Sequence, residues 1–166
     1  DDELTITEDE IEYQIRLGHD RSVFEQEAQG DLLISAVEFS ETVVKKVMIP
    51  RTDIFGLEAT TTIEDAVDAV IESGHSRIPV YQKSMDNILG LLHAKDLFQN
   101  LPGKVNKTDL TIEFIIRKPP MFAPETQKID NLLAKMRYRG KHMAIVVDEF
   151  GGTSGLITLE DIIEEL

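Results

Sequence analysis

The chain has 166 residues, of which 42% are hydrophobic and 29% are charged, so it can bury a core of ordinary size and is not broadly disordered. It contains no cysteine, which excludes a disulfide framework and thiolate metal sites. Its net charge of −14 is concentrated at the start, because residues 1–46 hold 13 acidic and 4 basic side chains, and a surface this acidic repels the phosphate backbone of nucleic acids.

No apolar run approaches the roughly 20 residues that a membrane-spanning helix needs. The chain begins at Asp1 and stops inside a predicted helix, so we expect it to be a piece of a longer protein.

The N-terminal arm, residues 1–46, is predicted to be an acidic helical connector. Thr7 and Glu10 have the pattern of a capping box that starts a short helix, and Gly18 is expected to end that helix. Residues 19–30 are polar and predict a loop.

A second helix of the arm is predicted from about Asp31. It would direct its apolar residues toward a core or a partner: Leu32, Leu33, Ala36, Val37 and Phe39. Ser40 is expected to cap a further short helix over 41–48, which Pro50 ends. The arm is therefore expected to pack on the remainder of the chain.

Residues 47–103 form the first of two predicted repeats. Thr62, with Asp65 three positions later, has the pattern of an N-cap, and the helix that it starts is expected to end at Gly74. The elements predicted in chain order are a strand at 54–57, this helix, strands at 77–81 and 88–93, and a helix at 95–101.

A polar linker at 104–111 leads to the second predicted repeat, residues 112–166. Pro119 and Pro120 exclude a helix near its start. The predicted elements are a strand at 122–123, a helix at 128–139, strands at 143–147 and 153–158, and a last helix at 159–166.

The two repeats are similar in sequence. GHSRIPVY at 74–81 corresponds to GKHMAIVV at 140–147, and ILGLLHAKDL at 88–97 corresponds to TSGLITLEDI at 153–162. Each repeat is expected to run strand, helix, strand, strand, helix, and neither can bury its apolar face alone. We therefore predict an α+β fold in which the repeats pack together with pseudo-twofold symmetry and create two related clefts.

Motifs of familiar enzyme classes are absent from the sequence. There is no cysteine nucleophile, no Gly-x-Ser-x-Gly elbow, no phosphate-cradling Gly-rich loop before a helix and no His-Glu-x-x-His. The four histidines lack ligand spacing, so no metal site is predicted: His19, His75, His93 and His142. The sequence disfavours catalysis and indicates a binding protein.

Thr158 and Asp161 lie three positions apart where a strand turns into a helix N-terminus, which attracts anions. The hydroxyl can bond a phosphate and the carboxylate can accept from a ribose diol, but the same pair can also be a capping box that only starts the helix. The first repeat has His93 and Asp96 at the matching positions, so its cleft lacks the hydroxyl and is predicted to be weaker. We call these the Thr158 cleft and the His93 cleft.

His75, Ser76 and Arg77 are expected to lie across the Thr158 cleft. They offer a planar ring, a hydroxyl and a cation. The guanidinium of Arg77 suits phosphate groups, although a surface salt bridge would explain this residue equally well.

These features together resemble the CBS-domain pair, or Bateman module, over about residues 47–166. Two runs narrow the resemblance: VMIPRTD at 47–53 followed by HSRIPVY, and HMAIVVDEFGGTSGLITLEDIIEE at 142–165. Both are similar to the CorC/HlyC (hemolysin-C-like) and cyclin-M-type magnesium and cobalt transporters. The arm is similar to the segment that joins the transmembrane domain of that family to its CBS pair.

The resemblance implies a regulatory module at the cytoplasmic face of the membrane that binds AMP or ATP (with Mg²⁺ on the latter), forms a homodimer and adjoins the membrane domain of a parent chain. By position, Thr158 would contact phosphate or ribose and Asp161 the ribose hydroxyls. The other implied contacts are Ile49 and His75 flanking the adenine, Met143 and Ala144 beside it, and Ser76 and Arg77 facing the phosphates.

Three functional hypotheses are consistent with these features. The leading one is a nucleotide-sensing regulatory module of a divalent-cation efflux protein. The second is a ligand-free dimerisation module, in which Thr158 and Asp161 only cap a helix. The third is an enzyme such as a phosphohydrolase that uses the acidic arm. It needs paired carboxylates around a metal ion, and no residue spacing in the sequence requires such a pair.

Overall fold

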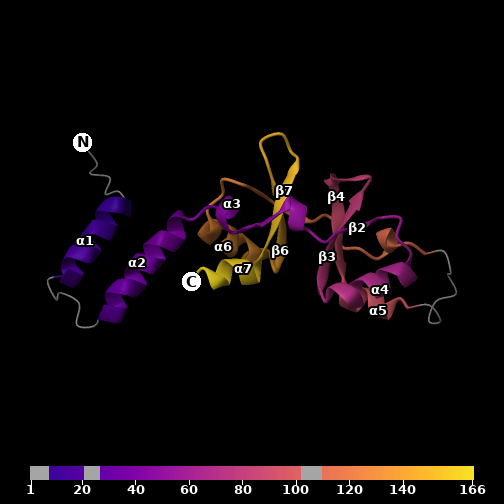
Figure 1. Ribbon diagram of the computed structural model, residues 1–166, viewed down its shortest axis with the longest axis horizontal. Helices are drawn as coiled ribbons and strands as arrows, with labels where there is room; N and C mark the ends of the chain where they lie inside the picture. The colour runs from indigo at the N-terminus through magenta and orange to yellow at the C-terminus, as the bar shows by residue number, and fades with distance from the viewer. Residues whose placement is uncertain (1–7, 21–26, 102–109) are drawn as a thin grey trace.

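The computed structural model describes residues 8–20, 27–101 and 110–166. Two α/β repeats lie side by side, and a helical hairpin extends from one side of them (Figure 1). One sheet has the strand order β1 (Ile49–Pro50), β7 (Thr153–Thr158), β6 (Met143–Val147) and β5 (Met121–Pro124), and the other has the order β2 (Leu57–Glu58), β3 (Arg77–Gln82) and β4 (Ser84–His93). The predicted α+β architecture, a tandem pair of related repeats preceded by a helical arm, is confirmed.

The hairpin consists of α1 (Glu8–Asp20) and α2 (Glu27–Glu41), whose predicted limits were partly wrong. Gly18 lies inside α1 rather than at its end, since one helical glycine costs only about 1 kcal/mol relative to alanine. The second helix starts four residues before Asp31. Ser40 does not cap a new helix, because it lies in α2 and its hydroxyl donates to the carbonyl of Val37 at 2.7 Å. Thr7 falls outside the described residues.

The end of the arm belongs to the core of the second repeat. The short helix α3 (Val44–Val47) contributes the fully buried Val44 to a cluster that includes Met121, Ile157 and Ile162. The amide of Val44 donates to the carbonyl of Gln127 at 2.8 Å. The expectation that the arm packs on the repeats is therefore confirmed for its last turn.

The first repeat follows its predicted order closely. Thr62 caps the helix by accepting from the Asp65 amide at 3.2 Å, and Gly74 ends the helix at φ 71°, in the left-handed region that glycine favours. Its elements are β2 (Leu57–Glu58), α4 (Ile63–Ser73), β3 (Arg77–Gln82), β4 (Ser84–His93) and α5 (Ala94–Gln99).

The second repeat contains both strands that were predicted for its hairpin, with the same limits. A turn at 148–152 joins them, as the run of Gly151 and Gly152 indicates. Its elements are η2 (Ile112–Phe114), β5 (Met121–Pro124), α6 (Ile129–Arg139), β6 (Met143–Val147), β7 (Thr153–Thr158) and α7 (Leu159–Glu164).

Each sheet is extended by a segment that precedes the other repeat's elements. The strand β1 (Ile49–Pro50) pairs antiparallel with β7, and Ile49 lies opposite Leu156. Correspondingly, the backbone of Arg117 exchanges two hydrogen bonds with Leu91 of β4, at 3.0 and 2.9 Å. The strand predicted at 54–57 was wrong, because a 3₁₀ turn η1 (Arg51–Asp53) follows β1 and only Leu57 of that range is in a strand.

Two glycines allow these crossing segments to approach. A Cβ atom on Gly155 would stand 2.3 Å from the carbonyl oxygen of Ile49, and one on Gly90 would stand 2.4 Å from that of Arg117. The two glycines occupy matching positions of the repeats. The sequence TSGLIT therefore matches ILGLLH for a packing reason.

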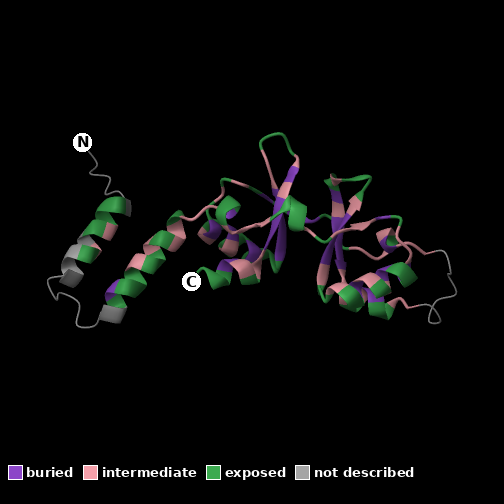
Figure 2. Cartoon of the chain, viewed as in Figure 1, coloured by how far each residue is buried: buried purple, intermediate pink, exposed green. Residues whose placement is uncertain are grey.

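The repeats meet through their β-hairpins. A buried cluster between them combines residues of β4, β6 and β7 (Figure 2): Ile88, Leu91, Met143, Ile145 and Leu156. At one edge of this seam Arg51 bonds the carboxylate of Asp86 and, at 3.1 Å, the carbonyl of Thr153. This ion pair holds the pKa of Asp86 below its usual value. Apolar burial and an ion pair thus fix how the repeats sit on each other.

Candidate functional site: two unequal clefts

The Thr158 cleft is a cavity of about 90 Å³ between the two sheets. Three strand ends meet at this cleft: Arg77 begins β3, Met143 begins β6 and Thr158 ends β7. It is lined by Ile49, Asp53, Ile54, Phe55, His75, Arg77, Pro79, Met143, Leu156 and Thr158. The inner wall is apolar, and the polar groups gather at the rim.

Aromatic rings close one side of this cleft. The rings of Phe55 and His75 lie with their centroids 5.9 Å apart at an interplanar angle of 37°. Both side chains are exposed at the surface, so their faces remain open to a planar ligand.

Thr158 and Asp161 form a complete capping box at the start of α7. The Thr158 hydroxyl oxygen accepts from the Asp161 amide at 3.1 Å, and Asp161 Oδ2 accepts from the Thr158 amide at 3.1 Å. The capping interpretation is therefore confirmed. It leaves the hydroxyl proton of Thr158 free to donate, and Asp161 Oδ1 has no partner among residues 8–20, 27–101 and 110–166.

The structure brings together most residues that the sequence predicted for this cleft. Five of them line the same cavity: Ile49, His75, Arg77, Met143 and Thr158. Ser76 lines an adjoining hollow with Thr158 and Glu160. Two predicted residues line none of the described cavities: Asp161, which exchanges two hydrogen bonds with Thr158, and Ala144, which is fully buried in the second repeat.

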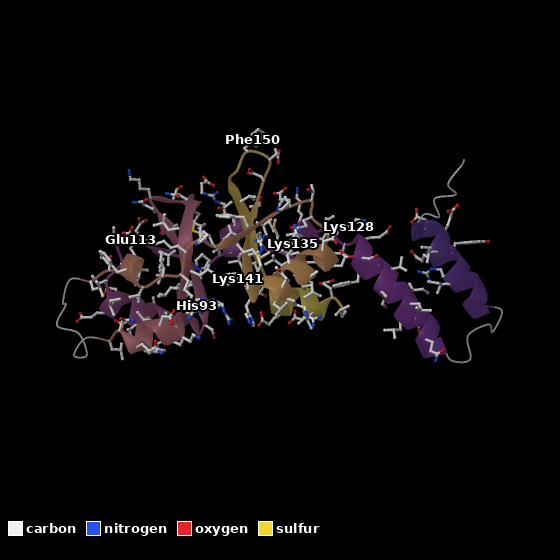
Figure 3. The ribbon with its side chains drawn as sticks, turned by 180° about the vertical axis from the view of Figure 1, so that it is seen from behind. His93, Glu113, Lys128, Lys135, Lys141 and Phe150 are labelled. Atoms are coloured by element: carbon white, nitrogen blue, oxygen red, sulfur yellow. The ribbon has the colours of Figure 1, made fainter. Side chains whose placement is uncertain are left out.

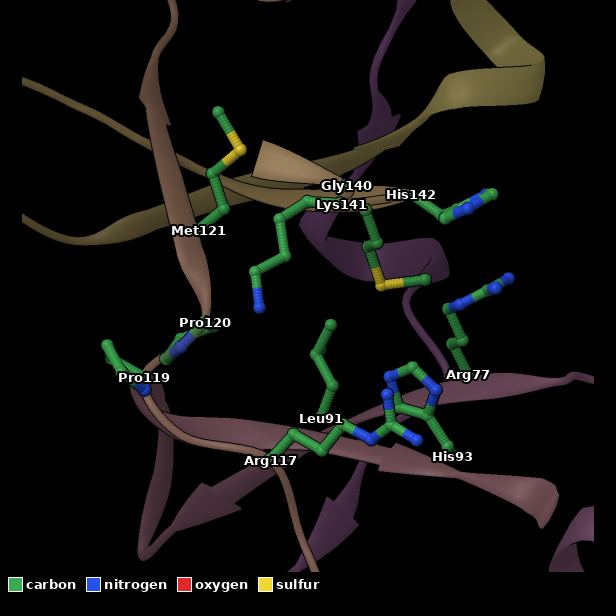
Figure 4. Close-up of a pocket in the computed structure, with 11 residues that line it drawn as sticks. Arg77, Leu91, His93, Arg117, Pro119, Pro120, Met121, Gly140, Lys141 and His142 are labelled. Atoms are coloured by element: carbon green, nitrogen blue, oxygen red, sulfur yellow. The ribbon is translucent and has the colours of Figure 1, made fainter. Parts of the chain in front are cut away.

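The His93 cleft lies at the matching place of the first repeat (Figure 4). Its inner part is lined by Arg77, Leu91, His93, Arg117, Pro119, Pro120, Met121, Gly140, Lys141, His142 and Met143. Its outer part adds Ser76, Ala94 and Lys95. Figure 3 shows His93 and Lys141 near one end of the seam and Phe150 at the opposite edge of the molecule.

In the His93 cleft, the carboxylate of Asp96 is already bound by Arg117. Its Nε donates to Asp96 Oδ2 at 2.8 Å and its Nη2 approaches Asp96 Oδ1 at 3.2 Å. This bidentate ion pair lowers the pKa of Asp96. His93 stands at the N-cap position of α5 without a capping hydrogen bond. Partial burial, then the positive charges of Arg117 and Arg77, lower the pKa of His93.

Several lining residues were not predicted from the sequence. Phe55 lies in the segment that was predicted as a strand, and Asp53 directly precedes it. The turn that brings both residues to the cleft was not predicted. Arg117 and Lys141 belong to the His93 cleft, which was described by His93 and Asp96 alone. A comparison of the cations near the matching positions of both repeats could have found Lys141, which precedes His142.

Two features are absent from the described parts of the chain. Among residues 8–20, 27–101 and 110–166, no three His, Cys, Asp or Glu side chains are grouped as a metal site requires. In the same ranges, no helix combines the length and apolar character of a membrane span.

Comparison with known proteins defines the class. The model of the CBS domain matches residues 44–103 and again 112–166, so the chain belongs to the CBS-domain family and holds a tandem pair. The identification made from the sequence is thereby confirmed.

Two curated relatives are similar to most of this chain. The chain is 40% identical to "Hemolysin C homolog" of Rickettsia rickettsii over 83% of this chain and 45% of that protein. It is 39% identical to "Magnesium and cobalt efflux protein CorC" of Pasteurella multocida over 82% of this chain and 44% of that protein. It thus spans less than half the length of these curated relatives.

A solved structure is similar over the whole CBS pair. It is the CBS domain of a bacterial CNNM/CorC family Mg²⁺ transporter in complex with ATP. The match has a TM-score of 0.77 and 42% sequence identity, and covers 83% of this chain and 96% of that one.

Proposed function

We propose that the chain is an adenine-nucleotide-binding regulatory module of a magnesium or cobalt transporter, and that the nucleotide occupies the Thr158 cleft. One observation carries this proposal: an apolar cavity joins the ring of His75, the cation of Arg77 and the hydroxyl of Thr158, which come from both repeats. ATP in a similar CBS pair supports the choice of ligand.

The chemistry of the lining suggests how the nucleotide lies. The adenine would enter between Ile49 and His75, against the apolar wall of the cavity. The hydroxyl proton of Thr158 and the guanidinium of Arg77 would meet the phosphates, and Asp161 Oδ1 would accept from a ribose hydroxyl. Capping and binding are compatible, because the capping box leaves these two groups unused.

Magnesium would enter as the counterion of ATP rather than on a site of the protein. No metal cluster is grouped in the described ranges. The carboxylates that line the two hollows are Asp53 in the cleft and Glu160 in the adjoining hollow, and they do not line the same one. With AMP, the same cleft would be filled without a metal ion.

Signal transmission would be a population shift of the pair. A ligand that touches both repeats favours one mutual arrangement of them. The helix α7, which Thr158 caps and which carries Asp161, packs through Ile162 into the cluster that holds Val44 of the arm. The arm would therefore pass the change to a membrane domain of the parent chain, from the cytoplasmic side where nucleotides are present.

Calorimetric titration of AMP and ATP tests the proposal. Asp161→Ala removes a charge-assisted hydrogen bond worth about 1.5–3 kcal/mol, so affinity should fall roughly 10- to 100-fold. Asp65→Ala is the matched control, because Asp65 has the same place after the capping Thr62, and Thr62, unlike Thr158, lines no described cavity.

Two results would overturn it. If the wild-type protein binds neither nucleotide at millimolar concentration, the module is a ligand-free dimerisation unit. If Asp161→Ala binds as tightly as wild type, the nucleotide lies elsewhere. Release of phosphate from ATP with Mg²⁺ would instead favour the phosphohydrolase hypothesis.

We also infer that two copies associate through the helical faces of the repeats. Four large apolar side chains are exposed on α4, α5, α6 and α7: Ile71, Phe98, Tyr138 and Ile163. Sedimentation should give a dimer for the wild type and a monomer when all four are changed to Ser. A monomeric wild type at micromolar concentration would contradict this inference.

A further inference from the structure

The His93 cleft gathers positive charge in a chain that is strongly negative. Its two parts are lined by Arg77, Lys95, Arg117 and Lys141, together with the imidazoles of His93 and His142. The chain as a whole has a net charge of −14. Such a local concentration of cations opposes the overall field and so calls for an anionic neighbour.

Acidic side chains of the protein neutralise this charge only in part. In the described parts of the chain Asp96 forms an ion pair with Arg117 and also lies within the field of Lys95, but no ion pair is found for Arg77, Lys95 or Lys141. Glu160 stands 4.0 Å from His142, at the edge of the cleft. Figure 4 shows Lys141 extending into the cavity from the opposite side to Arg117.

The same cleft is badly equipped for a ribose. Both oxygens of Asp96, the residue that matches Asp161, face the guanidinium of Arg117. His93 replaces the threonine hydroxyl, and the partly buried ring has a lowered pKa, so it tends to stay neutral in the absence of a ligand. A nucleoside would have to displace an ion pair, whereas an anion would not.

We propose that the His93 cleft is a site for a multivalent phosphate anion, held by Lys95, Lys141 and Arg77, and that it excludes a second nucleoside. Phosphate oxygens are acceptors that match ammonium and guanidinium donors. The proposal goes beyond nucleotide binding in the Thr158 cleft and does not depend on it.

Two sources could supply this phosphate chemistry. The hollow lined by Ser76, Arg77 and His142 adjoins both clefts, since Arg77 lines the Thr158 cleft and all three line the outer part of the His93 cleft. The anion could therefore be free inorganic polyphosphate, or the terminal phosphates of a nucleotide whose base lies in the Thr158 cleft.

Titration with inorganic tripolyphosphate at low salt is the first test. The wild type should bind it, with an affinity that falls as salt is added. The double variant Lys95→Gln, Lys141→Gln should bind it roughly 100-fold more weakly, because each of the two lost charge-assisted bonds costs about 10-fold. Lys135→Gln is the charge control, since Lys135 is exposed on α6 and lines neither cleft.

A variant that is expected to bind more tightly distinguishes loss of the anion site from loss of the fold. Asp96→Asn removes the partner of Arg117 and adds one net positive charge to the cleft, so tripolyphosphate should bind more tightly than to wild type. No general loss of structure would produce tighter binding.

The nucleotide arms separate the two sources. If the terminal phosphates of ATP enter the cleft, the double Lys variant loses affinity for ATP but keeps its affinity for AMP. If the anion is free, both nucleotide affinities are unchanged, and AMP and tripolyphosphate bind together. Absence of tripolyphosphate binding in wild type and Asp96→Asn, with unchanged ATP affinity in the double variant, would overturn the proposal. A failed AMP titration alone would remove only the nucleotide proposal.

Discussion

The two clefts occupy matching places in the two repeats, yet they differ in the side chains around the shared aspartate position. In the Thr158 cleft, the hydroxyl of Thr158 and the carboxylate of Asp161 each accept from the backbone amide of the other residue, which leaves the hydroxyl proton and Asp161 Oδ1 for a ligand. The His93 cleft has an imidazole and a carboxylate that an arginine already holds. The backbone fixes where a site can form, and a few side chains decide which chemistry it accepts.

The largest effect that tests this comparison is expected at the two matching glycines. Gly155→Ala and Gly90→Ala should each destabilise the protein by about 1–3 kcal/mol, because the new methyl group meets a backbone carbonyl that has no room to move. Urea unfolding measures the change. Ser84→Ala, an exposed substitution on β4, should stay within about 0.5 kcal/mol.

Nucleotide and anion titrations should tell the two glycine variants apart. Gly155→Ala displaces Ile49 and should weaken the Thr158 cleft, whereas Gly90→Ala displaces Arg117 and should disturb only the His93 cleft. Equal unfolding midpoints for both variants and wild type would show that the crossing segments are not held as described.

Converting one cleft into the other is the second prediction. The pair His93→Thr, Arg117→Gln should restore a hydroxyl and free the carboxylate of Asp96, so that calorimetry gives two bound nucleotides per chain instead of one. The new N-cap should also stabilise α5 by about 1 kcal/mol. Arg117→Lys alone keeps a cation beside Asp96 and should leave one nucleotide; two would contradict the blocking role of the arginine.

The smallest effect concerns pH and His93. The pKa of His93 is lowered from 6.5 in the folded state by burial, Arg117 and Arg77, while Asp96 opposes this shift. The unfolded chain therefore binds the proton more readily, and stability should fall as the pH drops below about 6.5. NMR titration of the ring should report this pKa, and it should rise when tripolyphosphate is added. His93→Gln should flatten this part of the stability profile.

Much of the fold was visible in the sequence because local signals agreed with each other. Both strands of the second hairpin were predicted with their limits, since β-branched residues fill them and glycines mark the turn. Thr62 and Thr158 indicated where their helices start, because a capping residue acts within one helical turn. The two repeats pointed to Thr158, Asp161 and residues 75–77, whereas Ile49, Met143 and Ala144 were implied only by the resemblance to the CBS-domain pair.

Non-local features could not be predicted. The pairing of Ile49 with Leu156 joins segments more than 100 positions apart, and no periodicity in a two-residue strand indicates it. No local sequence pattern indicates the ion pair of Arg117 with Asp96 either, because the two residues are 21 positions apart. In the arm, helix limits shifted because Gly18 and Ser40 are only weak helix breakers when neighbouring turns continue.

The crossing segments also determine how the chain could be divided. The second half folds around Val44 and is finished by Ile49 and Pro50, all of which come before the first half begins its own helix. A gene fragment started at residue 51 would leave the later sheet with a bare edge, and separating the halves would leave each one incomplete. The shortest segment that keeps both sheets complete is therefore the pair of repeats together with the turn before it. That turn begins near Thr42, whose carbonyl accepts a hydrogen bond from the Ile129 amide at 2.9 Å.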